Sequence, residues 1–265
     1  MRKELLQPLL GEFNLNQFHS PIEQLFWTSI LITPEEADRE LEVGESKLGG
    51  LPELPHGTEW PKSSNGEPLS FLAQINLKQI NDLSPNNSLP KSGFLYFFYD
   101  SKTQPSGDKA SDSQGFKVIY SPLEADPIAP QAIPEGLEDE NIYLPCPLNF
   151  SIDFNLPDYE SQAIANLDLS DDELNAYSDL VGRMIETYGC TGGISRLLGH
   201  ADLIDSCSMS LAKDWVLLLQ LDSHDEASML WGNGGRLYFF IEKAALESGD
   251  FSKTWLIRQE INNED

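Results

Sequence analysis

The chain has 265 residues, of which 43 are acidic and 17 basic, so its formal net charge at pH 7 is −26. A charge of this sign repels the phosphate backbone of nucleic acids and the anionic headgroups of membranes, so we expect neither as a partner. A hydrophobic content of 40% is ordinary for a globular protein and excludes disorder of the whole chain.

The cysteines and the N-terminus predict a cytoplasmic protein. Cys146, Cys190 and Cys207 form an odd set without CxxC spacing, which is typical of reduced thiols. Acidic and amide residues interrupt the first segment and no cleavage site follows it, so we expect no signal peptide. No apolar run approaches the ~18 residues that span a bilayer.

The first 68 residues predict a helix and an ordered loop. Residues 22–32 are apolar enough for a helix or a buried strand, and periodicity does not separate the two. Thr33 is suited to cap a helix, with Pro34 in its first turn and Glu36 completing a capping box. This pattern predicts a helix over 33–42. Residues 47–68 are dense in Gly and Pro and predict a loop.

The rest of the chain alternates strands with polar or proline-rich connections. Apolar and aromatic runs predict strands over 69–77, 94–100, 116–120, 215–222, 236–242 and 254–259. Helices are expected over 171–187, where Ser170 and Glu173 form a capping box, and over 243–248. Polar residues predict a hairpin loop over 101–115, and prolines predict an extended connector over 122–147.

Two sets of short, similar sequence motifs occur in the same order in the two halves of the chain. SKLGG, FLAQI and GFLYFF begin at Ser46, Phe71 and Gly93, and SRLLG, LLLQL and GRLYFF stand in the second half. The order predicts an internal duplication over approximately 46–121 and 195–260, with 122–194 as connector plus helix. The alternative is two unrelated strand pairs of similar composition. The duplication predicts an α+β fold of two repeated antiparallel β-meanders related by a pseudo-twofold. They form one body, a single domain over 1–265, with peripheral helices.

A groove where the two copies meet is the expected binding site, because pockets often form at such interfaces. The loops that open at Lys47 and Arg196 would line it, with cations for an acidic group and indoles for apolar contact. The predicted ligand-binding residues are Lys47, His56, Trp60, Arg196, His200 and Trp231. Each has a structural alternative, such as a paired cation or a packed aromatic ring.

Motifs for catalysis and cofactors do not stand out. The sequence lacks a GxSxG nucleophile elbow and a phosphate-binding loop. No second histidine lies at metal-ligand spacing from His56, and the spacing of His200 and His224 does not demand a composite metal site. We therefore predict no catalytic residue and no metal ligand, and no cofactor or oligomeric state is indicated.

The motifs SKLGGLPELPHGTEWP, PLSFLAQINL, GFLYFFYD, RLLGHADLI, LLLQLD and MLWGNGGRLYFFI, in this order, resemble the YwqG-like bacterial family of unknown function. The resemblance covers roughly Lys47 to the C-terminus. It implies a single-domain α+β protein of bacterial origin in the cytoplasm, and no established reaction. Some members lie near contact-toxin loci, which implies an immunity role as one option.

Three functions follow as hypotheses. The leading one is a non-enzymatic module that binds a protein or a small ligand in the groove between the repeats. The second is an acidic immunity-type protein that neutralises a basic toxin. The third is a hydrolase or transferase that uses His56 or His200, which requires one imidazole within hydrogen-bond reach of a carboxylate or nucleophile.

Overall fold

The computed structural model describes residues 2–122, 127–188, 195–205 and 214–261. Its main feature is a ten-stranded antiparallel sheet in the order β12-β11-β10-β9-β1-β8-β2-β4-β5-β6, beside a small sheet of β3 and β7. The strands are β1 (Trp27–Pro34), β2 (Lys47–Leu48), β3 (Glu53–Pro55), β4 (Ser70–Asn76), β5 (Phe94–Tyr99), β6 (Phe116–Ser121), β7 (Ile128–Pro130), β8 (Cys146–Asn155), β9 (Ser195–Leu197), β10 (Trp215–Asp222), β11 (Gly235–Glu242) and β12 (Thr254–Glu260). The helices are α1 (Arg2–Glu12), α2 (His19–Leu25), α3 (Leu77–Leu83), α4 (Gln162–Ala165), α5 (Asp171–Tyr188) and α6 (Lys243–Ser248).

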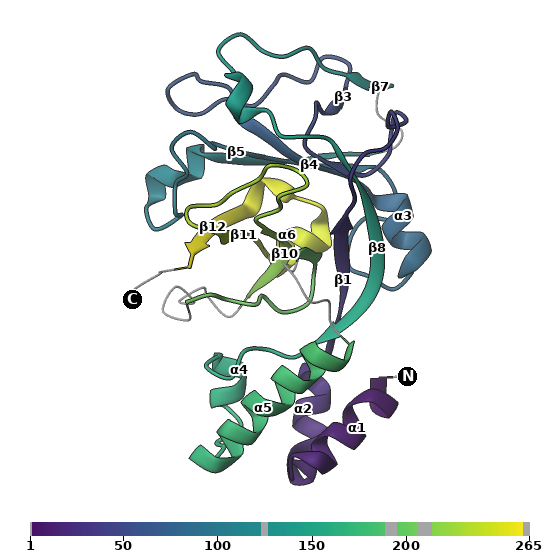
Figure 1. The fold of residues 1–265 in the computed structure, drawn as a ribbon, viewed down its shortest axis with the longest axis vertical. Coiled ribbons are helices and arrows are strands. Elements are labelled where there is room, and N and C mark those ends of the chain that lie inside the picture. The colour runs from purple at the N-terminus through teal and green to yellow at the C-terminus, as the bar shows by residue number, and fades with distance from the viewer. Residues whose placement is uncertain (1, 123–126, 189–194, 206–213, 262–265) are drawn as a thin grey trace.

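The strands β1 and β8 form the central pair of the large sheet. They run antiparallel over the whole length of β1, from the Trp27–Asn155 pair to the Pro34–Leu148 pair. On its other side β1 pairs with β9, and β8 pairs with β2. Figure 1 shows the two long strands side by side, running from the level of β4 past β10 to β12 down to the helices. Every hydrogen-bonded path across the sheet therefore passes through β1 and β8.

The helix expected over 33–42 is wrong. Thr33 and Pro34 end the strand β1 opposite Asn149 and Leu148, and the Glu35 N–H continues the pairing by donating to the Pro147 carbonyl at 3.0 Å. A capping box is a local signal, and strand pairing with a distant segment overrides it here. The ambiguous segment 22–32 is divided between the helix α2 and the strand β1.

The connector-plus-helix reading of 122–194 missed the strand β8. Leu148, Phe150, Ile152 and Phe154 alternate with polar residues at the period of a strand, so a signal was present. The expected extended connector over 122–147 also contains β7, which pairs with β3. This missed strand is the one that joins the two halves of the sheet.

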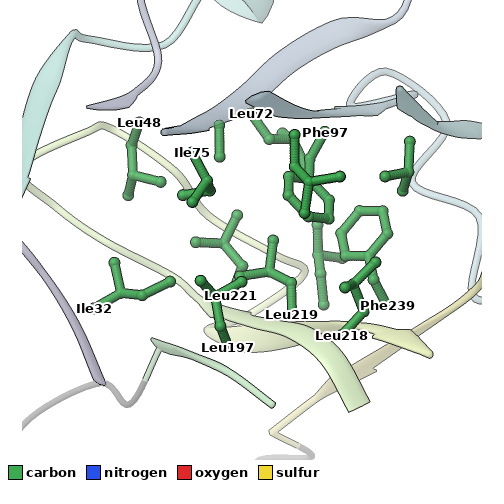
Figure 2. Close-up of a cluster of buried hydrophobic side chains, with 14 of the residues drawn as sticks. Ile32, Leu48, Leu72, Ile75, Phe97, Leu197, Leu218, Leu219, Leu221 and Phe239 are labelled. Carbon is green, nitrogen blue, oxygen red and sulfur yellow. The ribbon is translucent and has the colours of Figure 1, made fainter. Parts of the chain in front are cut away.

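The two halves of the sheet enclose one hydrophobic core. Side chains from β4 and β5 meet side chains from β10 and β11, as Figure 2 shows for Ile75 and Phe97 above Leu219 and Phe239. The rings of Phe97 and Phe239 meet edge to face, with their centroids 5.1 Å apart. The large sheet therefore bends until it is nearly closed, and both halves bury their apolar side chains against each other.

Four helices form a separate layer with its own core. α1, α2, α4 and α5 gather at the end of the molecule opposite β3 and β7 (Figure 1). Their buried apolar residues, among them Leu6, Leu10, Ile22 and Tyr177, cluster apart from the core of the sheet. None of the helices in the described part of the chain combines the length and apolar character that spanning a bilayer requires.

All six expected strands and both expected helices beyond residue 68 are present. The Ser170 N–H donates to Glu173 Oε2 at 2.9 Å, as the capping box requires, and α5 follows. Gly249 ends α6 in the left-handed conformation at φ 73°. The cysteines Cys190 and Cys207, expected to be reduced thiols, lie outside the described residues. The α+β class is confirmed as mixed helix and antiparallel sheet.

We expect a chain that begins at Ser46 to lose cooperative folding. Without β1, the strands β8 and β9 have no partner on one side, and the core loses Ile32, which is 2% exposed. The milder variant Ile32→Ala should lower the free energy of unfolding by about 2–5 kcal/mol. Ile133→Ala, at a site that is 51% exposed, is the control. Urea unfolding followed by circular dichroism measures all three, and a sharp transition in the truncated chain would contradict the expectation.

Candidate functional site

Lys47 lies in a buried polar cluster of the first half. Its ammonium group donates to Glu53 Oε1 at 2.5 Å, and both side chains are under 10% exposed. The amide of Gln74 accepts from the Glu53 backbone N–H at 3.0 Å and donates to Glu53 Oε2 at 2.7 Å. The hydroxyl of Tyr96 donates to the Glu53 carbonyl at 2.7 Å. Glu53 is thus held from three sides, and the charge of Lys47 is neutralised within the protein.

Arg196 lies in a cluster of the same design in the second half. Its guanidinium pairs with Asp202 Oδ2 at 2.9 Å. The amide of Gln220 accepts from the Asp202 backbone N–H at 2.9 Å and donates to Asp202 Oδ2 at 3.2 Å. The hydroxyl of Tyr238 donates to the Asp202 carbonyl at 2.7 Å. In both clusters the cation, the glutamine and the tyrosine occupy paired positions on three neighbouring strands.

The second cluster carries one more carboxylate than the first. Asp153 on β8 lies 3.7 Å from the Arg196 guanidinium and accepts a hydrogen bond from Ser29. Burial raises the pKa of Asp153, and the charge of Arg196 lowers it in part. The Nε of Arg196 is buried and has no hydrogen-bond partner within the described residues. The two expected cations therefore serve separate carboxylates and do not converge on one surface.

His56 and Trp60 lie on the loop that covers the first half. His56 is exposed in the turn after β3. Trp60 is half-buried, donates its indole N–H to the Leu69 carbonyl at 2.8 Å and meets the ring of Phe98 edge to face. Trp60 therefore fastens the loop to the sheet.

His200 packs behind an exposed tryptophan. Its ring stacks on Trp27 with centroids 4.2 Å apart, and its Nε2 lies 2.7 Å from the Leu25 carbonyl. Burial lowers the pKa of His200 to about 4, and the nearby Arg196 lowers it further. The imidazole is therefore neutral at pH 7. Within the described residues, neither His56 nor His200 forms a hydrogen bond to a carboxylate, so the geometry gives the enzymatic hypothesis no support.

Trp231 is part of the core. It is fully buried, meets the rings of Tyr99 and Tyr143 edge to face, and donates its indole N–H to the Asp222 carbonyl at 3.1 Å. Arg196 and His200 lie together, since the Arg196 guanidinium donates to the His200 carbonyl at 3.3 Å. The other expected site residues lie apart from them: Lys47 in the first polar cluster, His56 and Trp60 on the covering loop, and Trp231 in the core.

A groove lies between the two halves, and none of the six expected site residues lines it. It has a volume of about 680 Å³ and is lined mainly by apolar side chains, with Ile30, Ile152 and Phe154 of the central strands among them. One rim is the segment after α3, with Asn86 and Ser88, and the other is the helix α6. Trp27 and Ile152 are 40% and 42% exposed there. No pattern in the sequence indicated this groove, because its floor comes largely from β1 and β8, two strands that were not predicted.

Leu198 and Gly199 form one wall of the groove. Both residues have a positive φ, 60° and 77°. The left-handed region is costly for a residue with a side chain, by roughly 1–2 kcal/mol, so Leu198 is strained. At the matching place in the first half the chain has Gly49, whose backbone N–H donates to Leu72 as that of Leu198 donates to Leu218.

The described residues contain no group of three or more His, Cys, Asp or Glu side chains placed to hold a metal ion. His224, the third histidine considered from the sequence, lies with its Nε2 2.7 Å from the Ser195 hydroxyl.

Comparison with protein families places residues 46–259 in a family described as a domain of unknown function, DUF1963. The chain is a member of this family. The region matched in this DUF1963 protein includes both polar clusters but begins after β1. A comparison with curated proteins finds no match.

We expect Lys47→Met to lower the free energy of unfolding by about 3–5 kcal/mol, since it leaves the buried carboxylate of Glu53 without its partner. Arg196→Met should cost less, because the side chain of Asp202 is 26% exposed and water can solvate it. The control is Lys78→Met, which breaks the exposed pair with Asp82 and should change stability little. Urea unfolding at pH 7.5 gives the comparison. Losses no larger than that of the control would show that these clusters do not stabilise the fold.

His200 should make the protein less stable in mild acid. Its folded pKa of about 4 lies below the unfolded value of 6.5, so the unfolded chain binds the proton first as pH falls through that window. At pH 5 this amounts to about 2 kcal/mol relative to pH 7.5. His200→Gln should show a correspondingly smaller loss of stability between these two pH values. Equal losses in both proteins would contradict the assignment.

Proposed function

We propose that this protein is a non-enzymatic binding module whose ligand occupies the groove between the two halves. The observation that carries the proposal is the groove itself, an apolar depression of about 680 Å³ lined from both halves. Its size falls within the range of small-molecule sites, which are mostly apolar with a few polar groups. Exposed apolar side chains at the rim of a concave surface favour an interaction role.

The end of the sheet opposite the groove is closed by the chain itself, and this difference supports the proposal. There the segment after β10 closes the core with Ala227, Met229 and Trp231, which are at most 1% exposed. The Leu144 N–H donates to the Ala227 carbonyl at 3.0 Å and fixes this closure. At the groove end the segment after α3 leaves Ile152 exposed. An occupant of the groove would bury apolar surface that the chain buries by itself at the other end.

We also propose that the halves arose by duplication, approximately over 46–121 and 195–260, within a single domain over 1–265. The strand order reads the same from both ends when β1 is matched with β8. Both halves carry the same polar cluster, and both have a register shift at the matching place, beside Leu72 and Leu218. These agreements and the sequence motifs support a YwqG-like protein. The buried free thiol of Cys146 supports a cytoplasmic one. Limited proteolysis that releases two folded halves would contradict the single domain.

A neutral polarity-sensitive dye such as Nile red tests the groove. We expect its fluorescence to rise with the wild-type protein and to rise far less with Ile152→Asn, which makes the floor polar. Ile133→Asn is the matched control, because Ile133 is also an exposed isoleucine but does not line the groove. No enhancement, or equal enhancement in all three proteins, would refute the proposed site.

The acidic character favours a second candidate, the neutralisation of a basic protein as an immunity factor would achieve it. A depression of about 590 Å³ is lined by Glu35, Glu36, Asp38, Glu45 and Glu226, with Arg39 as its cation. An octa-arginine peptide should bind at low salt and dissociate as salt rises. Glu35→Gln with Glu226→Gln should weaken it more than Glu40→Gln with Glu247→Gln. Equal effects of the two double variants would show that only net charge matters.

A further inference from the structure

We infer that the groove binds a small amphiphile with an aliphatic body and a carboxylate head. The inference rests on the proposed function, because it assigns a ligand class to the same groove. Three features carry it: hydrogen-bond donors in the groove, its apolar floor, and the strained residue in its wall.

The first donor is the backbone N–H of Gly199. Gly199 is buried and lines the groove, and its N–H has no hydrogen-bond partner within the described part of the chain. At the matching place in the first half, the N–H of Gly50 donates to the Tyr143 carbonyl at 2.8 Å. Buried backbone N–H groups without a partner are rare in proteins, so an oxygen acceptor on a ligand is expected here.

The second donor is the ammonium group of Lys243 on α6. Lys243 lines the groove and forms no ion pair with a described residue. Glu247 lies one turn further along the same helix and also lines the groove, without pairing with it. Lys62, Lys117 and Lys253 likewise form no ion pair within the described residues, but none of them lines the groove. The groove therefore offers one unused cation, which complements an anionic head.

The floor fits an aliphatic body. Ile30, Ile152, Phe154 and Val216 present apolar side chains between the two rims. Burying aliphatic carbon there is favourable by roughly 25 cal/mol per Å² of apolar surface. A chain of about eight carbons occupies only part of the volume of about 680 Å³, so its size is no obstacle.

Leu198 gives independent support. Its left-handed backbone is strained, whereas the first half has glycine at the matching place. A Cβ added to Gly49 would collide with the carbonyl oxygen of Leu144, so glycine is required there. At position 198 the side chain is accommodated without such a collision, and it lines the groove. Strain of this kind is typical of residues that serve a site.

Three probes with the same alkyl chain test the head group: octanoate, 1-octanol and octylammonium. Titration is followed by nuclear magnetic resonance of the full chain, with groove signals assigned through Ile152→Asn. We expect octanoate to bind more tightly than 1-octanol and octylammonium to bind weakest. Lys243→Gln should weaken octanoate about tenfold and leave 1-octanol unchanged. Lys253→Gln, which removes a cation outside the groove, is the matched control.

The outcomes separate the inference from the proposed function. If 1-octanol binds as tightly as octanoate and Lys243→Gln has no effect, the carboxylate inference is overturned while the apolar groove stands. If no probe shifts the groove signals, both fail. Leu198→Gly adds a second measurement: relief of strain should preserve or raise stability while octanoate affinity falls at least threefold. Unchanged affinity in that variant would remove Leu198 from the site.

Discussion

The antiparallel pairing of β1 with β8 is the interaction on which the rest of this structure depends. Each strand has a half of the sheet on its outer side, so this one ladder joins all ten strands. Because side chains alternate along a strand, its register decides which residues enter the core. It turns Ile30 and Ile32 into the shared core and sets Ser29 against Asp153 on the other face. A slip by one residue would exchange the two faces.

The outer face of each half is organised around a buried cation. The chain has few cations for its net charge of −26, yet Lys47 and Arg196 both form ion pairs with carboxylates of the protein. Each pair is costly to desolvate, and a hydrogen bond from a glutamine amide to the carboxylate offsets part of that cost in both halves. Glu53 and Asp202 also lie in the segments that cover the sheet. Their backbone N–H groups donate to the glutamine side chains and so attach these segments to the strands. The clusters therefore explain how irregular loops are held over strands, and they give these two cations a structural role.

The matching halves differ where the sheet ends. One end is closed by aromatic and apolar side chains around Trp231, and the other is the groove beside Ile152. Similar strands thus produce one sealed and one open end, because the connecting segments differ. The proposed binding role depends on this difference and on the central strands, which form the floor of the groove.

The sequence by itself determined six apolar strands, the capped helix α5 and the α+β class. These follow from local periodicity and capping, which act over a few residues. Only the tertiary structure decided that residues 33–34 extend a strand, that β8 lies at the centre of the sheet and that the groove forms on those two strands. Pairing between residues more than a hundred positions apart outweighs a local helix cap, and a surface made by distant segments leaves no pattern in either one.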